Sequence, residues 1–338
     1  MKTVLVTGPG TTEVVEIDAP TVGKNDVLVA MKACGICGSD QMYTTYGGIP
    51  PRQGATPLGH EPAGEVIEVG SDVSWIAPGA HVVMDTMRFE DGLLGSGGAQ
   101  GALSELVLVT DAVEGLQLRV IPDEIPWEVA ALNEPMAVAR HAVNRLDPKP
   151  ADKVAVFGAG PIGLGVVLSL KRRGVAHVVV VDIVPNRLEK ALLVGADAVI
   201  NSAEENVVER LVELHGQSTG LGLRGLKSAT DGYVDAAGAP AVIATVLEAA
   251  GHGAEVVVVA VHKRPVEFDL GALLTTELTV KLSMGYPTEI FEVTDDIIEN
   301  WEKYALLVSD RIPFSRVQDA LELASQPGVA EKVVVVFD

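Results

Sequence analysis

The stretch Lys153 to Asp182 constrains the fold of this chain more than any other segment. An apolar run over Val154 to Phe157 leads into the turn Gly158-Ala-Gly160-Pro-Ile-Gly163. An apolar helical segment follows as far as Arg173, and a second apolar run ends at Asp182. This order predicts a strand, a tight turn, a helix and a second strand.

The spacing of the three glycines is typical of a turn that binds a dinucleotide. Gly158 would permit the sharp turn, Gly160 would let the backbone approach a pyrophosphate, and Gly163 would let the helix pack closely on the strand. The start of the helix would face the phosphates. We therefore expect a dinucleotide to contact Gly158, Gly160, Pro161, Ile162 and Gly163, although glycine patterns of this kind also occur in ordinary turns.

Asp182 predicts which dinucleotide binds. A carboxylate at the end of the second strand can accept hydrogen bonds from the ribose hydroxyls of the adenosine and would repel a 2′-phosphate. Ile183 and Val184 follow it, and Arg187 is the nearest cation and a further candidate contact. The sequence therefore favours NAD over NADP.

The size and charge of the chain limit the possible functions. Two domains are expected for 338 residues, because a single hydrophobic core usually stops growing below this length. The formal charge of −21 argues against nucleic-acid and anionic-membrane partners. Two cysteines fit a reducing compartment, and we find neither a signal peptide nor 18 consecutive apolar residues. We expect a soluble, cytoplasmic protein.

The first 145 residues contain short apolar runs separated by Gly, Pro, Asn and Asp, which predicts a small all-β barrel. Two motifs interrupt this pattern, Cys34-Gly-Ile-Cys37-Gly-Ser39-Asp40 and Gly59-His60-Glu61. A thiol, an imidazole and an adjoining carboxylate suit a zinc site that keeps an open coordination position. The alternative is that Cys37 is a small buried hydrophobe and His60 a core or surface histidine.

A third motif, Asn133-Glu134-Pro-Met-Ala-Val-Ala-Arg-His-Ala142, reads as a helix with a carboxylate in its first turn. With this motif the chain resembles the zinc-dependent medium-chain dehydrogenases of the alcohol dehydrogenase superfamily. The order and spacing of Gly-Ile-Cys-Gly-Ser-Asp, Gly-His-Glu, Glu-Pro-Met-Ala-Val-Ala and Gly-Ala-Gly-Pro-Ile-Gly carry the resemblance. It covers nearly the whole chain and is strongest to the butanediol, sorbitol and threonine dehydrogenase branch.

The resemblance implies an α/β protein with a GroES-like β-barrel catalytic domain and a Rossmann nucleotide-binding domain with a doubly wound parallel sheet. Residues 1–145 and 286–338 would form the catalytic domain and residues 146–285 the NAD-binding domain, with the active site in the cleft between them. We also expect a homo-oligomer, either a dimer or a tetramer.

The resemblance also implies roles for individual residues. The ligands of one catalytic zinc would be Cys37, His60, Glu61 and, in some relatives, Glu134. Asp40 would orient the zinc histidine, and Ser39 would relay the substrate proton toward the cofactor ribose, although both residues are also suited to simple turn capping.

Charge explains why both glutamates need not bind zinc at once. Zn²⁺ with one thiolate and one carboxylate is formally neutral, whereas a second carboxylate would make the site anionic and disfavour an alkoxide. Which glutamate is the resting ligand stays open.

Three departures from the family limit what the resemblance implies. Met42 stands where polyol dehydrogenases commonly have the outer histidine of the proton relay. Residues Asp85 to Gly101 are short and lack the four cysteines that bind a structural zinc in many relatives, so no structural zinc is expected. In Leu282-Ser-Met-Gly285-Tyr286, Gly285 replaces an arginine that binds extra hydroxyls in polyol-specific members. A less hydroxylated substrate is favoured.

Beyond Asp182, strands alternate with helices, which predicts a parallel doubly wound sheet. The expected strands are Ala198 to Ile200, Tyr233 to Ala236 and Glu255 to Val261, and the expected helices are Asn186 to Val194, Val207 to His215 and Ala241 to Ala250. Gly216 to Gly232 reads as a surface loop. In the tail we expect a helix from Glu289, a second helix over Val317 to Ala324 and a last strand over Lys332 to Phe337.

These patterns together predict a zinc- and NAD-dependent dehydrogenase, with Cys37, Ser39, His60 and Glu61 as its catalytic residues. Its substrate would be a secondary alcohol or ketone of the diol, polyol or amino-alcohol type. The alternatives are a zinc-free NAD(P)H reductase of the same superfamily and a non-catalytic NAD(H)-binding protein.

Overall fold

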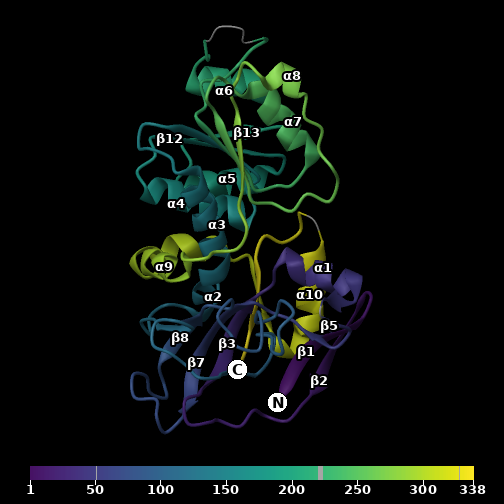
Figure 1. Ribbon diagram of the computed structural model, residues 1–338, viewed down its shortest axis with the longest axis vertical. Coiled ribbons are helices and arrows are strands. Elements are labelled where there is room, and N and C mark those ends of the chain that lie inside the picture. Colours follow the sequence, from purple (N-terminus) through teal and green to yellow (C-terminus); the bar gives the residue numbers. More distant parts are fainter. Residues whose placement is uncertain (51, 220–223, 327) are drawn as a thin grey trace. The chain divides into compact units, whose positions relative to one another are not determined.

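The computed structural model describes residues 1–50, 52–219, 224–326 and 328–338. It divides the chain into two compact units. Unit 1 comprises Met1–Glu134 and Ile290–Asp338, and unit 2 comprises Pro135–Glu289. The C-terminal segment, yellow in Figure 1, therefore belongs to the same unit as the purple and blue N-terminal strands.

Unit 1 is built on sheets of short, mostly antiparallel strands. One sheet has the order β2-β1-β6, with β1 Lys2–Gly8, β2 Thr11–Glu16 and β6 Thr56–Pro57. The largest has the order β10-β8-β7-β3-β18-β17, and β9 also pairs with β3. Its strands are β3 Val27–Gly35, β7 Glu61–Val69, β8 His81–Met84, β9 Leu106–Val109, β10 Leu118–Val120, β17 Asp310–Pro313 and β18 Val333–Val336, while β4 Gly48–Ile49 and β5 Arg52–Gln53 form a two-stranded pair.

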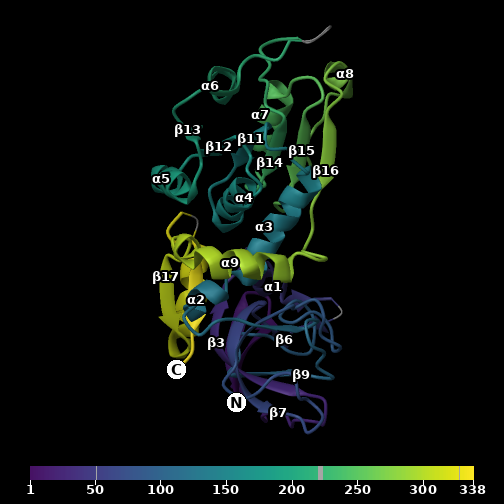
Figure 2. The ribbon, with the colours of Figure 1, turned by 90° about the vertical axis from the view of Figure 1, so that its left-hand side faces the viewer.

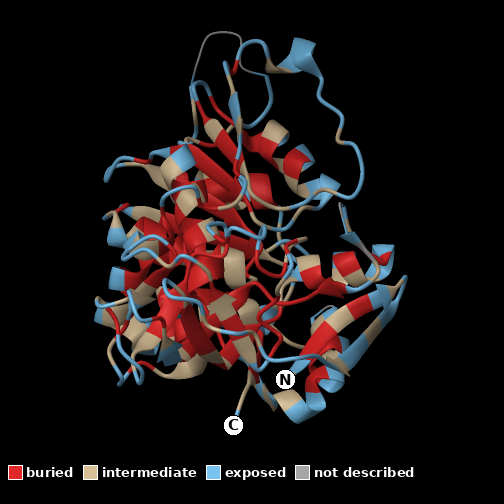
Figure 3. Cartoon of the chain, turned by 60° about the horizontal axis from the view of Figure 1, so that its bottom comes forward, coloured by how far each residue is buried: buried red, intermediate tan, exposed pale blue. Residues whose placement is uncertain are grey.

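Apolar residues at alternate strand positions form the core of unit 1. Val4, Val29, Val66 and Val82 are fully buried in one cluster, and the strands in Figure 3 are largely red. The helices of this unit are α1 Gly38–Tyr46, α2 Trp127–Ala130, α9 Ile290–Ala305, the 3₁₀ helix Phe314–Arg316 and α10 Val317–Ser325. Helices α2 and α9 lie side by side (Figure 2).

Unit 2 is a parallel sheet of six strands in the order β13-β12-β11-β14-β15-β16. These are β11 Lys153–Phe157, β12 His177–Asp182, β13 Ala198–Asn201, β14 Gly232–Asp235, β15 Glu255–Val258 and β16 Thr279–Leu282. The connecting helices are α4 Pro161–Arg172, α5 Pro185–Val194, α6 Val207–His215, α7 Pro240–Ala249 and α8 Leu270–Leu273, and α3 Asn133–Leu146 leads into this unit.

The arrangement of helices in unit 2 is that of a doubly wound sheet. Helix α4 packs on α5, and α6 packs on α7. Because crossover connections between parallel strands are right-handed, these pairs cover opposite faces of the sheet. The predicted Rossmann arrangement is confirmed.

The observed elements agree closely with those expected from the sequence, with small shifts at the ends. Strand β15 ends at Val258 rather than Val261, and β14 ends at Asp235 rather than Ala236. The loop predicted over Gly216 to Gly232 includes residues 220–223, which lie outside the described residues. Among the described residues, no helix has both the length and the apolar character needed to cross a membrane.

Candidate functional site

The pairing of two strands brings the zinc motifs of unit 1 together. Strands β3 and β7 are antiparallel, and Gly35 at the end of β3 lies opposite Glu61 at the start of β7. Cys37 follows β3 as the N-cap residue of α1, and His60 directly precedes β7. The two motifs therefore meet at one end of this strand pair.

Gly59 makes the approach to β7 possible. Its φ of +92° lies in the left-handed region, and a Cβ there would come within 2.4 Å of the backbone nitrogen of Leu103. Only glycine fits this position without strain. The turn before His60 is therefore fixed by the backbone requirement at Gly59.

The three expected ligand types are close enough to share a metal ion. One donor atom each of Cys37, His60 and Glu61 lies within 4.8 Å of the others. Tetrahedral zinc with bonds of about 2.0–2.3 Å needs comparable or slightly shorter separations between ligand atoms. His60 and Glu61 are buried, and Cys37 is half-buried.

The donor set contains a buried oxygen that the protein leaves unpaired. Glu61 is 1% exposed, and its Oε1 has no hydrogen-bond partner among the described residues. A buried carboxylate oxygen without a donor is costly, and a cation would satisfy it. The residues present therefore fit a zinc ion.

Asp40 holds the histidine from the opposite side. Its Oδ1 lies 3.5 Å from Nδ1 of His60, and its Oδ2 accepts a hydrogen bond of 2.9 Å from the backbone N–H of Cys37. Burial lowers the pKa of His60, but the charges of Asp40 and Cys37 outweigh it and hold this pKa well above its usual value. Because Asp40 lies at Nδ1, Nε2 is the ring nitrogen of His60 that would bind a metal, in place of its contact with Ser39.

Ser39 lies beside the same imidazole. Its Oγ is 3.1 Å from Nε2 of His60, within hydrogen-bond distance. A hydroxyl in this position can exchange a proton with an alcohol oxygen bound near the histidine.

Glu134 is buried at the start of α3, but its carboxylate is not part of the group formed by Cys37, His60 and Glu61. Burial raises its pKa to about 8, while the positive charges of His60 and Lys332 oppose this shift. Its role as a zinc ligand stays a prediction.

Lys332 is a further site residue, although its sequence pattern indicates only the start of the last strand. It is 3% exposed, its ammonium group pairs with Oε2 of Glu61, and it donates a hydrogen bond of 3.1 Å to the carbonyl of Ile36. Gly35 makes room for the pair, since a Cβ there would lie 1.9 Å from Oε2 of Glu61. The only feature of the sequence that could have indicated a buried lysine is its position directly before four valines.

In unit 2 each glycine of the turn has the expected surroundings. Gly158 has a φ of +97°, and a Cβ on Gly163 would lie 1.8 Å from the carbonyl oxygen of Gly158. Gly160 is the N-cap residue of α4, and a Cβ there would meet nothing within 4 Å. The space above Gly160 is therefore open to a phosphate at the start of a helix.

Asp182 ends β12 and is tied to the same turn. Its Oδ2 accepts a hydrogen bond of 2.6 Å from the backbone N–H of Ala159, and its Oδ1 accepts from the N–H groups of Ile183 and Val184. Each oxygen keeps further acceptor capacity for a ribose hydroxyl.

Comparison with known proteins finds related dehydrogenases for both units. The zinc-binding dehydrogenase family model matches residues 161–300, and the alcohol dehydrogenase GroES-like domain model matches residues 23–117. (R,R)-butanediol dehydrogenase of Bacillus subtilis is 33% identical over 293 residues, or 80% of each chain. Sorbitol dehydrogenase of Bos taurus is 30% identical over 99% of this chain and 95% of its own. The crystal structure of 2R,3R-butanediol dehydrogenase from Bacillus subtilis superposes with a TM-score of 0.85 and 28% identity, covering 99% of each chain.

This chain belongs to the zinc-dependent alcohol dehydrogenase family. The resemblance inferred from the four motifs is confirmed, and so are the GroES-like and Rossmann fold types. The protein is a dehydrogenase that acts on alcohols with zinc and a nicotinamide dinucleotide.

Cys34, the second cysteine of this dehydrogenase, is a structural residue. It is fully buried in the core of unit 1, and its thiol donates to the carbonyl of Gly35. Burial and the neighbouring carboxylate of Asp40 raise the pKa of its thiol far above the usual range. The thiol is therefore not available as a thiolate.

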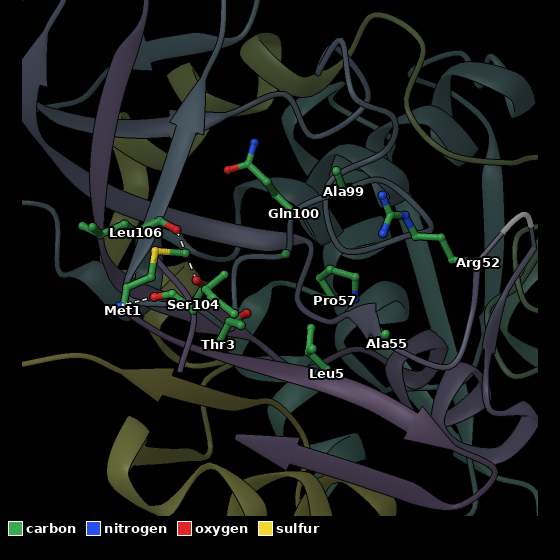
Figure 4. Close-up of a pocket in the computed structure, with 12 residues that line it drawn as sticks. Met1, Thr3, Leu5, Arg52, Ala55, Pro57, Ala99, Gln100, Ser104 and Leu106 are labelled. Atoms are coloured by element: carbon green, nitrogen blue, oxygen red, sulfur yellow. Dashed lines mark hydrogen bonds between the residues drawn. The ribbon is translucent and has the colours of Figure 1, made fainter. Parts of the chain in front are cut away.

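A cavity of about 190 Å³ lies elsewhere in unit 1, where Leu5, Pro57 and Gln100 contribute to its lining (Figure 4). The amide of Gln100 is already bonded to the carbonyl of Leu108 and to Asp91. None of the metal-site residues lines this cavity, so it is separate from the zinc site of the dehydrogenase.

Proposed function

We propose that this dehydrogenase interconverts a secondary alcohol of the diol type and the corresponding ketone, with NAD(H) as the cofactor. The observation that carries the proposal is the convergence of Cys37, His60 and Glu61, with a buried and unpaired Glu61 oxygen, in a chain whose other unit has a dinucleotide-binding turn. Cys37, His60 and Glu61 would hold the zinc, with Glu134 as a further ligand.

Bound zinc supplies Lewis-acid polarisation of the alcohol oxygen, and NAD supplies the hydride acceptor. Ser39, whose Oγ is 3.1 Å from Nε2 of His60, would accept the proton of the alcohol and pass its own hydroxyl proton on toward the cofactor ribose. Asp40 fixes the orientation of the His60 ring. Lys332 fixes one oxygen of Glu61 and leaves the other free.

The preference for NAD rests on Asp182. In the present structure its carboxylate lies within hydrogen-bond distance of Ala159 in the glycine turn, which supports a position beside the adenosine ribose. Gly158, Gly160, Pro161, Ile162 and Gly163 would bind the pyrophosphate, with Arg187 nearby on α5.

We also propose that residues 1–145 and 286–338 act as the catalytic domain and residues 146–285 as the nucleotide-binding domain. The proposed assembly is a homo-oligomer, a dimer or a tetramer, located in the cytoplasm. The negative charge of −21 supports a small-molecule substrate rather than a nucleic acid.

The diol proposal rests on the segment around Gly285. Gly285 has a φ of +63°, and Tyr286 is buried. With glycine in place of an arginine, this segment offers no guanidinium to the additional hydroxyls of a long polyol. The relatives include both a butanediol dehydrogenase and sorbitol dehydrogenases, so the two substrate classes are the natural comparison.

A substrate panel tests this proposal. NADH formation by the zinc-loaded protein would be followed with the stereoisomers of 2,3-butanediol, with threonine and with sorbitol. We expect kcat/KM for one butanediol isomer to exceed that for sorbitol at least about tenfold, equivalent to about 1.4 kcal/mol. A preference for sorbitol would overturn the diol proposal, and no NADH formation with any secondary alcohol would overturn the proposed reaction.

A further inference from the structure

The order of the strands in unit 2 identifies where the two halves of a dinucleotide lie on the sheet. From β11 the chain first builds outward through β12 and β13, and then returns to build β14, β15 and β16 on the other side. In open α/β sheets, ligands bind beyond the carboxyl ends of the strands at the point where this order reverses. That point lies between β11 and β14.

The glycine turn and Asp182 would bind only one half of the dinucleotide, on the β12 side of the position where the strand order reverses. They follow β11 and β12, and they fit the pyrophosphate and the adenosine ribose. The rest of the dinucleotide must therefore extend over the carboxyl ends of β14 and β15. The segments that follow these two strands begin at Ala236 and Val259.

A buried acid and a histidine join these two segments. Asp235 is the last residue of β14 and is 0% exposed. Its Oδ2 is 2.6 Å from Nε2 of His262, and its Oδ1 accepts from the N–H groups of Ala237 and Gly238. An ionised carboxylate only accepts, so the Nε2–H group of His262 donates to it.

The two segments also pack tightly on each other and on the glycine turn. A Cβ on Gly238 would lie 2.8 Å from the carbonyl oxygen of Val261, and one on Gly158 would lie 3.1 Å from atoms of Ala236 and Ala237. The pair of Asp235 and His262 is therefore part of the same strand-end surface as the phosphate-binding turn.

The other ring nitrogen of His262 has no hydrogen-bond partner in the described part of the chain. Its Nδ1 is screened from solvent and makes no hydrogen bond within the described residues, although the side chain as a whole is half-buried. Buried polar atoms in proteins are nearly always paired, so an unpaired one at a ligand-binding edge indicates a missing partner. With Nε2 protonated, Nδ1 of the neutral ring is an acceptor.

We propose that His262, oriented by Asp235, binds the nicotinamide half of the dinucleotide by accepting a hydrogen bond at Nδ1. The hydroxyls of the nicotinamide ribose and the amide N–H groups of the carboxamide are both suitable donors. His262 is then a cofactor-binding residue, and Asp235 is a positioning residue. This inference rests on the proposed dinucleotide function of unit 2.

Comparison of a whole and a truncated cofactor tests the proposal. ADP contains the adenosine and both phosphates but lacks the nicotinamide and its ribose. Calorimetric titration of the full chain should show that His262→Ala raises the Kd for NADH about tenfold and leaves the Kd for ADP within about twofold of wild type. Should His262→Ala fail to fold, His262→Phe, which keeps a ring but has no hydrogen-bond acceptor, takes its place with the same expected separation between the two nucleotides.

Two further variants serve as controls. His252→Ala replaces an exposed histidine of the same unit, paired with Glu277, and should change neither Kd. Asp182→Ala should weaken both nucleotides. An unchanged NADH affinity for the His262 variant, or equal losses for NADH and ADP, would overturn the role of His262 alone. Failure of the wild type to bind either nucleotide would overturn the proposed function and this inference with it.

Discussion

The buried pair of Lys332 and Glu61 shows how a single side chain controls the charge of the zinc site. Glu61 is 1% exposed and Lys332 is 3% exposed, so water cannot stabilise either charge. Burial lowers the pKa of Lys332, but the charges of Glu61 and Cys37 outweigh this effect and raise it. The lysine therefore stays charged and compensates the carboxylate when zinc is absent.

Lys332→Met removes this compensation. We expect the free energy of unfolding of the metal-free protein to fall by about 3–5 kcal/mol, the usual cost of breaking a buried pair from one side. The loss should be smaller with zinc bound, because the ion would then neutralise Glu61. Urea unfolding in the presence of a chelator or of stoichiometric zinc measures both values.

Lys32→Met is the matched control for that experiment. Lys32 on β3 pairs with Glu65 on β7 at 3.5 Å, so its partner lies on the same strand as Glu61, but the two side chains are 24% and 34% exposed. An ion pair so open to water is worth about 0–1 kcal/mol. Equal losses in the two variants would contradict the role assigned to Lys332.

At Asp182 the expected effect is on cofactor choice. The wild type should prefer NAD over NADP in kcat/KM at least about tenfold, or about 1.4 kcal/mol. Asp182→Ser removes the acceptor for the ribose and the repulsion of the 2′-phosphate. We therefore expect kcat/KM to fall with NAD and to rise with NADP, so that the two values approach each other. Steady-state kinetics with both cofactors tests this. A preference for NAD over NADP that the substitution leaves unchanged would show that Asp182 does not bind the ribose.

Individual residues were predictable only where a local motif contains them. Cys37, His60 and Asp182 belong to short motifs, and the neighbouring residues in the sequence indicate their chemistry. Lys332 and His262 carry no such pattern, because their partners Glu61 and Asp235 are distant in the sequence. Their roles follow only from the pairing of strands.

At the scale of elements, two glycines of the turn between β11 and α4 have different roles. We expect Gly163 to be needed for folding and Gly160 to be needed for cofactor binding. A Cβ on Gly163 would collide with the carbonyl of Gly158, whereas a Cβ on Gly160 would point into open space. Gly163→Ala should therefore lower the melting temperature by several degrees, as a loss of about 1–3 kcal/mol does. Gly160→Ala should leave it nearly unchanged but weaken NADH binding about tenfold or more.

Calorimetric melting and NADH titration of the two variants measure these effects. Unchanged NADH affinity in Gly160→Ala, or equal melting temperatures of the two variants, would contradict the separate roles of Gly160 and Gly163.

A second element-scale prediction concerns the histidine that joins β12, α6 and the segment before β14. His215 is 1% exposed, its Nδ1 is 2.7 Å from Oγ1 of Thr230, and its Nε2 is 3.0 Å from Nδ1 of His177. Burial, followed by the charges of His177 and Lys153, lowers the pKa of His215 to about 4. The histidine is therefore neutral in the folded protein near pH 7.

This lowered pKa makes stability depend on pH with a known sign. The unfolded chain binds a proton at its ordinary pKa near 6.5, so between about pH 6.5 and 4 it holds more protons than the folded chain. The contribution of His215 to stability is fully present above this window and is lost as the pH falls, by at most about 3 kcal/mol. Urea unfolding at pH 7 and 4.5 should show a smaller drop for His215→Gln than for the wild type. Equal drops would contradict this prediction.

The elements themselves were largely predictable, because periodic apolar patterns define them locally. The expected helix over Val207 to His215 matches α6, and the helix expected from Glu289 appears as α9. Strand β16 was not predicted. Thr279 and Val280 are exposed there, so the strand has no buried apolar pattern to reveal it.

At the scale of the whole molecule, the sequence predicted the family but not the internal organisation of each site. The four motifs were sufficient for the zinc-dependent dehydrogenases, since each is local and their order is fixed. Which glutamate belongs with Cys37 and His60 depends on the register between β3 and β7, and the structure places Glu61 there. Sequence distance alone did not decide between Glu61 and Glu134.

We propose that zinc held by Cys37 is required for the reaction. The most direct measurement compares zinc content by mass spectrometry, NADH affinity and alcohol-dependent turnover in the wild type, Cys37→Ser and Cys34→Ala. Cys34→Ala is the control, because this cysteine is buried in the core and donates to Gly35.

We expect about one zinc per chain in the wild type and in Cys34→Ala. Cys37→Ser should lose most of its zinc and nearly all turnover while its NADH affinity stays unchanged. Full zinc content and turnover in Cys37→Ser, or loss of zinc in Cys34→Ala alone, would contradict the account.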